Sequence, residues 1–206
     1  KALEAQYNLD QSLWQQYVSY LGDVVQGDFG PSFKYSGRTV NELIAAGLPI
    51  TAELGLYALL IALIIGVAAG VVAAIKPNTM QDYIPMSAAM LGICMPSFLL
   101  GPLLVLVFGI YLDWLPVSGW GDIPGDKILP SITLGAAYAA YIARLSRGGM
   151  LEILSQDYIR TARAKGLSEP LIIAKHALRG GLIPVVAFLG PAFAGLLGGS
   201  FVVETI

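Results

Sequence analysis

Four long stretches of this sequence contain no charged residue, and this spacing of charge limits the folds that the chain can adopt. A helix needs about 20 apolar residues to cross a lipid bilayer. The uncharged stretches are 22, 30, 16 and 24 residues long and cover 54–75, 83–112, 128–143 and 180–203. The third is short, but it extends through Ser146 if the Arg144 side chain reaches the membrane surface or faces protein. The sequence therefore predicts an all-α, polytopic membrane helical bundle with four spans.

The composition agrees with a membrane environment. Only 13% of the residues are charged and 56% are hydrophobic, whereas about a quarter of an average soluble domain is charged. The single cysteine, Cys94, excludes an intrachain disulfide and is expected to be a buried apolar residue. The lone histidine, His176, has no serine, cysteine or carboxylate at catalytic or metal-ligand spacing. We therefore predict no catalytic residues and no metal site, and we expect His176 to pack where the loop meets the last span.

The distribution of basic residues predicts the orientation of the spans. Cytoplasmic loops are enriched in lysine and arginine. The loop after the first span holds Lys76, and the segment 144–179 holds seven of the other basic residues, so 8 of 12 lie on one side. The opposite side is mainly acidic and carries Trp114 and Trp120. The segment 144–179 is therefore expected to be cytoplasmic, and residues 1–50 are expected to form an external segment preceding a membrane domain at 51–206.

The external segment has its own helix and turn signals. Asp10 is a candidate N-cap for a helix at 11–25, and a second short helix is predicted at 39–46. Glycines and a proline predict a loop at 27–32. Both helices are expected to lie at the membrane surface.

Small residues and prolines give the spans internal features. Gly66 and Gly70 form a GxxxG pair, which lets helices approach closely. Pro191, Gly195 and Gly199 recur at intervals of four in the last span. This second pattern indicates either helix packing or a residue set that lines or gates a pathway. Three prolines are expected to bend the second span: Pro85, Pro96 and Pro102.

The segment 150–180 is polar enough to leave the membrane. It predicts a helix at 151–165 that Gly166 ends, followed by an N-cap at Ser168 and a second helix from Glu169 into the last span. Its basic residues suit anionic lipid or a cytosolic protein partner. Nucleic acid is disfavoured because aromatic residues do not interleave with the basic ones.

This loop resembles the cytoplasmic signature of ATP-binding-cassette importer permeases, which is Glu-Ala-Ala, three residues, Gly, nine residues, then Ile-x-Leu-Pro. Gly166, Ala162 and Leu178 match, whereas Arg160, Thr161, His176 and Arg179 depart in the manner of the dipeptide and oligopeptide branch. Other stretches resemble the same branch, and the first permease of its pair more than the second. They lie at 27–32, 96–98, 114–116, 190–193 and 203–206.

The resemblance implies a type I importer transmembrane domain with four of six expected spans, in a bacterial or archaeal plasma membrane. Its implied partners are a second permease subunit, two cytosolic ATPase subunits that hold ATP and Mg, an external substrate-binding protein and membrane lipid. A coupling helix is expected at 166–171. The coupling residues implied are Arg160, Thr161, Ala162, Arg163, Lys165, Gly166, Leu167, Ser168, His176 and Leu178.

The resemblance implies a di- or oligopeptide cargo, with nickel or glutathione as alternatives. The chain has no phosphate-binding glycine-lysine loop of its own, which fits a passive permease. An ion-coupled carrier or channel is the rival class, but such carriers place ionisable residues within their spans. Only Glu53, Arg144 and Glu204 lie near the uncharged stretches as candidates. A purely structural membrane scaffold is the third class.

Overall fold

The computed structural model describes residues 12–199, and the chain divides into two compact units at 1–50 and 51–206. The described residues fold into helices and connecting turns, with one isolated bridge between Pro31 and Thr39. Each unit is described separately below.

The first unit contains helix α2 (Leu13–Val25). Ser12 caps it, because the Ser12 hydroxyl accepts a hydrogen bond from the Gln15 amide and the Gln15 side chain accepts one from the Ser12 amide. The helix predicted at 11–25 is described from Leu13 onward, and the predicted cap Asp10 and first residue Gln11 lie outside the described residues. None of the residues in α2 is buried, so the helix exposes its apolar side chains.

The loop predicted at 27–32 is present and is tied to the start of α3 (Val40–Ile75). The Asn41 side chain accepts a hydrogen bond from the Phe29 amide at 2.8 Å and donates one to the Gly27 carbonyl. The prediction of a separate short helix at 39–46 was wrong, because these residues form the first turns of α3, which continues through Pro49.

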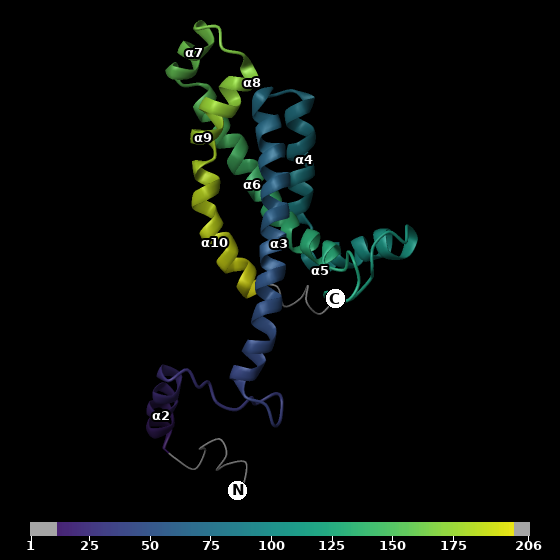
Figure 1. Ribbon diagram of the computed structural model, residues 1–206, viewed down its shortest axis with the longest axis vertical. Coiled ribbons are helices and arrows are strands. Elements are labelled where there is room, and N and C mark those ends of the chain that lie inside the picture. The colour runs from purple at the N-terminus through teal and green to yellow at the C-terminus, as the bar shows by residue number, and fades with distance from the viewer. Residues whose placement is uncertain (1–11, 200–206) are drawn as a thin grey trace. The chain divides into compact units, whose positions relative to one another are not determined.

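The second unit is a helical bundle (Figure 1). Helices α3 and α6 are each long and apolar enough to cross a membrane. Two further pairs of consecutive helices are long and apolar enough only when each pair is taken as one span. The two members of a pair meet at bends of 109° and 48°. The elements of this unit after α3 are α4 (Met80–Cys94), α5 (Ser97–Leu104), η1 (Val105–Tyr111), α6 (Ile128–Leu154), α7 (Asp157–Ala164), α8 (Glu169–Leu171), η2 (Ile172–Ala177), α9 (Leu178–Gly181) and α10 (Ile183–Gly199).

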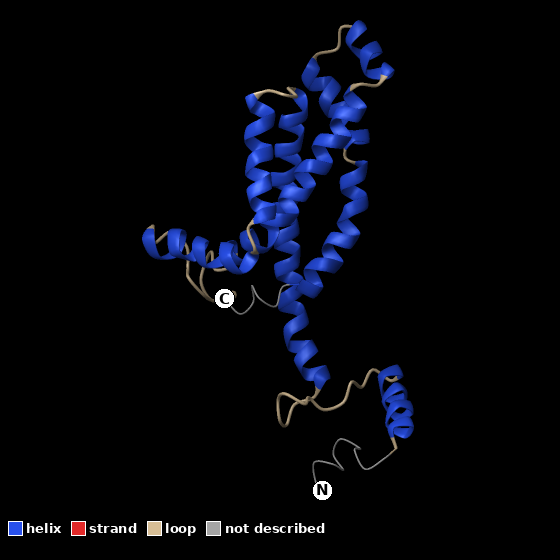
Figure 2. Ribbon diagram, turned by 180° about the vertical axis from the view of Figure 1, so that it is seen from behind, coloured by secondary structure: helices blue, strands red, loops and turns tan. Residues whose placement is uncertain are grey.

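The second uncharged stretch is broken at Pro96. Helix α4 ends at Cys94, and the helix formed by α5 and η1 leaves at 109° to it (Figure 2). The predicted bend is therefore confirmed at Pro96, whereas Pro85 and Pro102 lie inside α4 and α5. A proline removes a backbone donor and fixes its own φ, so it favours a break between helices. The stretch 83–112 is accordingly not one straight helix.

Helix α6 is the central element of the bundle, and its contacts with α3 depend on glycine. A Cβ built on Gly66 would lie 2.6 Å from the Ala139 carbonyl oxygen, and one on Gly70 would lie 2.4 Å from that of Ala143. Side chains at these positions would have to displace backbone. The predicted role of this glycine pair in close helix packing is therefore confirmed.

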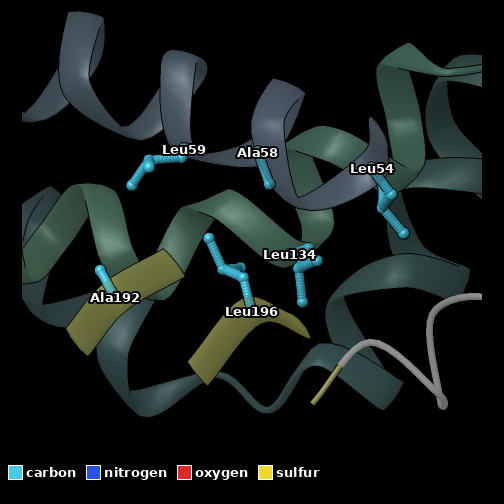
Figure 3. Packing of buried hydrophobic residues seen from close by; sticks show 6 residues of the cluster. All are labelled: Leu54, Ala58, Leu59, Leu134, Ala192 and Leu196. Atoms are coloured by element: carbon cyan, nitrogen blue, oxygen red, sulfur yellow. The ribbon is translucent and has the colours of Figure 1, made fainter. Parts of the chain in front are cut away.

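An apolar core joins α3, α6 and α10 (Figure 3). Leu54, Ala58 and Leu59 come from α3, and they pack against side chains of the other two helices. Those side chains are Leu134 of α6 and Ala192 and Leu196 of α10. The core thus places the last described helix against the centre of the bundle.

Two ion pairs hold the ends of α6. At its start, Lys127 donates to Glu53 of α3 at 2.5 Å. Near its end, the Arg147 guanidinium donates two hydrogen bonds of 2.6 Å to the Asp82 carboxylate of α4. Asp82 is 2% exposed and also accepts a hydrogen bond from the Asn78 amide. A bidentate pair of this kind fixes orientation as well as distance.

We predict that Gly70→Ala destabilises the bundle, because the added methyl group would overlap the Ala143 carbonyl. Overpacking of this kind typically costs about 1–3 kcal/mol. The apparent melting temperature of the purified membrane protein measures the effect. Gly148→Ala is the matched control, since a Cβ at Gly148 meets nothing within 4 Å. Equal melting temperatures for the two variants would contradict the packing role of Gly70.

We predict that Asp82→Asn also lowers the melting temperature, because Arg147 then keeps its charge without a carboxylate. Breaking a buried pair costs about 3–5 kcal/mol, and the lower end applies because the Arg147 side chain is 29% exposed. Asp122→Asn provides the control, since Asp122 is exposed. A variant at position 82 as stable as this control would show that the pair does not hold α4 to α6.

Candidate functional site

The candidate site is the segment 155–181, whose first part, with α7, projects from one end of the bundle (Figure 1). The prediction of one helix at 151–165 was wrong, because α6 ends at Leu154 and α7 begins at Asp157. Gln156 lies in extended backbone between the two helices. The interruption produces a separate helix of eight residues, in which the Thr161 hydroxyl donates to the Asp157 carbonyl at 3.0 Å.

Gly166 ends α7, as the sequence predicts. The Leu167 amide donates to the Ala162 carbonyl, and the Gly166 amide donates to the Arg163 carbonyl. These two bonds form a Schellman motif, which requires a left-handed residue after the helix cap. Gly166 has a φ of +80°, so glycine suits the position. Ser168 then lies at the predicted N-cap position of the next helix.

The predicted coupling helix at 166–171 does not exist as a separate element. Residues 166–168 form the turn, and Glu169–Leu171 is the first turn of a longer helix that runs through η2 and α9 to Gly181. That helix was predicted to enter the last span directly, but it breaks at Leu182, where the axis bends by 48°. The separate short helix in this region is α7.

The inner face of α7 is anchored in an apolar core. Ile159 is fully buried and Ala162 is 7% exposed. They belong to a cluster contributed by α3, α6, η2 and α7, whose other buried members are Ala74, Met150, Ile172 and Ala177. Ala162 therefore faces the bundle, and its small size fits that internal packing.

The outer face of α7 and the turn after it are exposed. This set contains seven of the ten predicted coupling residues, which are Arg160, Thr161, Arg163, Lys165, Gly166, Leu167 and Ser168. Of the remaining three, Ala162 is buried, whereas His176 and Leu178 are half-buried in η2 and at the start of α9. Leu178 packs against the cluster that anchors α7.

An ion pair closes the turn between the two helices. The Arg163 guanidinium donates to the two carboxylate oxygens of Glu169 at 2.7 and 3.3 Å. This hydrogen bonding raises the pKa of the Arg163 guanidinium above its usual value, against the opposing effect of burial. The sequence placed Glu169 only at the start of a helix, and this ion pair was not predicted from it. Arg160 has a longer contact with Asp157, at 3.4 Å.

The three residues proposed for a pathway lie on α10. A Cβ on Gly195 would lie 2.9 Å from the Tyr138 hydroxyl of α6, which favours the packing interpretation for this glycine. Pro191 is exposed. Gly199 is the last residue of α10, and its exposure lies outside the described residues.

Of the three ionisable residues that lie near the uncharged stretches, the structure describes two. Glu53 pairs with Lys127, Arg144 is exposed, and Glu204 lies outside the described residues. The buried pair Asp82–Arg147 was missed, because nothing in the sequence indicates which helix Arg147 faces. Residues 12–199 contain no group of three or more His, Cys, Asp or Glu that could hold a metal ion. Cys94, expected to be buried, is exposed.

These observations define a multi-pass α-helical membrane protein with a short anchored helix at one end of its bundle. Residues 66–206 match the family model described as the binding-protein-dependent transport system inner membrane component. The chain belongs to this family of transport permeases.

Several relatives resemble the chain over almost its full length. It is 53% identical over 205 residues to the oligopeptide transport system permease protein OppB of Salmonella typhimurium. The Escherichia coli K12 OppB is 51% identical, and the dipeptide transport system permease protein DppB of Bacillus subtilis is 47% identical. The alignments cover 99%, 99% and 100% of this chain and 67% of each relative. The chain thus spans about two-thirds of their length.

A solved structure shares the fold. It is described as the crystal structure of an amino acid ABC transporter with histidines, and it superposes with a TM-score of 0.58 at 19% identity. The superposition covers 80% of this chain and 72% of the other. The predicted fold class, an all-α type I importer transmembrane domain, is confirmed, as is the resemblance to the dipeptide and oligopeptide branch.

We predict that the pair Arg163–Glu169 acts within this chain. Arg163→Glu places two carboxylates together and should loosen the turn, whereas the double variant Arg163→Glu, Glu169→Arg should restore it. Hydrogen exchange of the amides at 163–169 in the purified permease measures the effect. An exposed pair contributes about 0.2–1 kcal/mol, so roughly 1.4- to fivefold faster exchange is expected in the single variant. Exchange that stays fast in the double variant would contradict the internal role.

Proposed function

We propose that this chain is a permease subunit that imports di- or oligopeptides, and that cytosolic ATPase subunits drive it by docking on the loop 158–180. The observation that carries the proposal is α7, a short helix with a buried inner face and a charged, exposed outer face. A displacement of α7 by a docked partner would move the bundle as well, because Ile159 and Ala162 share one core with α3 and α6. ATP and Mg would then be bound by the ATPase subunits.

The names of the relatives support a peptide cargo. Those reported above are oligopeptide and dipeptide permeases, which favours peptides over nickel or glutathione for this chain. The family description, binding-protein-dependent transport, favours an external substrate-binding protein as a partner and disfavours an ion-coupled carrier or a scaffold. A second permease subunit would complete the pathway.

The distribution of charge supports a cytoplasmic position for the docking loop. It carries the basic residues expected on the cytoplasmic side, and Lys76 follows α3 directly on the way to α4. With this orientation, ATPases would meet the outer face of α7 in the cytosol. This face contains Arg160, and the turn after it contains Lys165 and Leu167, so both charged and apolar contacts are available.

We predict that Gly166→Val reduces peptide uptake at least tenfold, because a β-branched residue at a φ of +80° distorts the turn that positions α7. The assay uses the full complex of both permeases, the ATPases and the binding protein in proteoliposomes, with a labelled tripeptide. ATP hydrolysis is measured in the same vesicles. We expect hydrolysis to become less dependent on the binding protein and its peptide.

Gly166→Asn is the matched control, because asparagine tolerates the left-handed conformation and should retain most of the uptake. Normal uptake by the valine variant would count against docking on this loop. Failure of the unaltered complex to accumulate peptide, with nickel or glutathione accumulated instead, would overturn the proposed cargo.

A further inference from the structure

A groove of about 380 Å³ lies between the start of α4 and the second half of α6. Tyr83, Met86 and Met90 line it from α4, together with Asp82. The lining residues from α6 are Arg144, Arg147 and Gly148. The groove is separate from the loop 158–180, and the transport mechanism proposed above does not use it.

The two arginines of the groove differ in charge balance. Arg147 is neutralised by the buried Asp82 carboxylate through two hydrogen bonds of 2.6 Å. Arg144 is exposed, and no carboxylate within residues 12–199 pairs with it. The groove therefore carries one uncompensated positive charge. An occupant with a single negative group near Arg144 would balance it.

The apolar part of the groove extends into the uncharged stretch of α4. Met86 and Met90 lie four and eight residues after Asp82, which places them about 6 and 12 Å further along the helix axis. Met90 is 50% exposed and Tyr83 is 55% exposed, so the protein leaves these side chains uncovered. Arg144 directly follows the uncharged stretch 128–143. In a membrane, the charged end of the groove would therefore lie near the lipid headgroups, and Met90 would lie at the depth of the acyl chains.

We propose that this groove binds an anionic phospholipid, whose phosphate contacts Arg144 and whose acyl chain packs along Met86 and Met90. Basic pockets between membrane helices are suited to lipid headgroups of this charge. Methionine side chains adapt to irregular surfaces such as a disordered acyl chain. The inference needs the helices to lie in a membrane, and it does not depend on the cargo or on docking of ATPases.

Photo-crosslinking in the intact transporter complex tests the site. The complex is incubated with phosphatidylglycerol or phosphatidylcholine that carries a diazirine on one acyl chain, and mass spectrometry quantifies the label on peptides containing Met86 and Met90. We expect phosphatidylglycerol to label them about fivefold more. That is the preference that one arginine near the headgroup gives at about 1 kcal/mol.

Substitutions at the two ends of the groove separate charge from shape. Arg144→Gln should abolish the preference for the anionic lipid, and Arg144→Lys should retain most of it. Lys175→Gln is the control for charge, because Lys175 is exposed and outside the groove. Gly148→Leu should fill the groove and reduce labelling by both lipids, since a Cβ there meets nothing within 4 Å. Gly190→Leu, at an equally open position in α10, should leave labelling unchanged.

Two results would overturn the proposal. One is an undiminished preference for phosphatidylglycerol in Arg144→Gln. The other is the absence of lipid label at Met86 and Met90 together with cross-links from this groove to the second permease, which would show that protein covers it. Melting temperatures of all variants are compared with the unaltered complex, so that loss of label through unfolding is recognised.

Discussion

Close approach of backbones along α6 is the constraint on which the rest of this structure depends. In a bilayer, lipid is as apolar as leucine, so helices associate through packing at short range. Gly66 and Gly70 let α3 approach α6 within contact of its carbonyl groups, and Gly149 does the same for Gly181 of α9. Met150 follows Gly149 and contributes to the core that anchors α7. The position of α7 thus follows from glycines elsewhere in the bundle.

Much of this arrangement can be predicted from the sequence, because an uncharged stretch of about 20 residues is the length that a helix needs to cross the bilayer. The uncharged stretches at 54–75 and 128–143 fall within α3 and α6. Gly166 and Ser168 were placed correctly because a left-handed turn and an N-cap have local chemical signatures. The resemblance of the loop 158–184 to a known signature identified the family. Local signals of this kind operate within a few residues and need no knowledge of the fold.

Features that depend on the relative positions of helices were not predictable. Asp82 and Arg147 are 65 residues apart, and only the packing of α4 on α6 brings them together. Pro96 indicated a bend, but the 109° angle between α4 and the helix formed by α5 and η1 depends on tertiary contacts. The break between Leu154 and Asp157 was missed because these residues have ordinary helical composition. The pair Arg163–Glu169 could have been inferred, since a Schellman turn at Gly166 reverses the chain and brings these side chains together.

The two faces of α7 have a consequence for how such a transporter can change over evolutionary time. Ile159 and Ala162 face the permease core, whereas Arg160 and the following turn residues Lys165 and Leu167 are exposed. Substitutions on the outer face leave the core intact, so selection for a new partner can act on them without a loss of folding. If α7 docks an ATPase as proposed, a few surface substitutions could adapt it to an altered partner, while the inner residues remain restricted by volume.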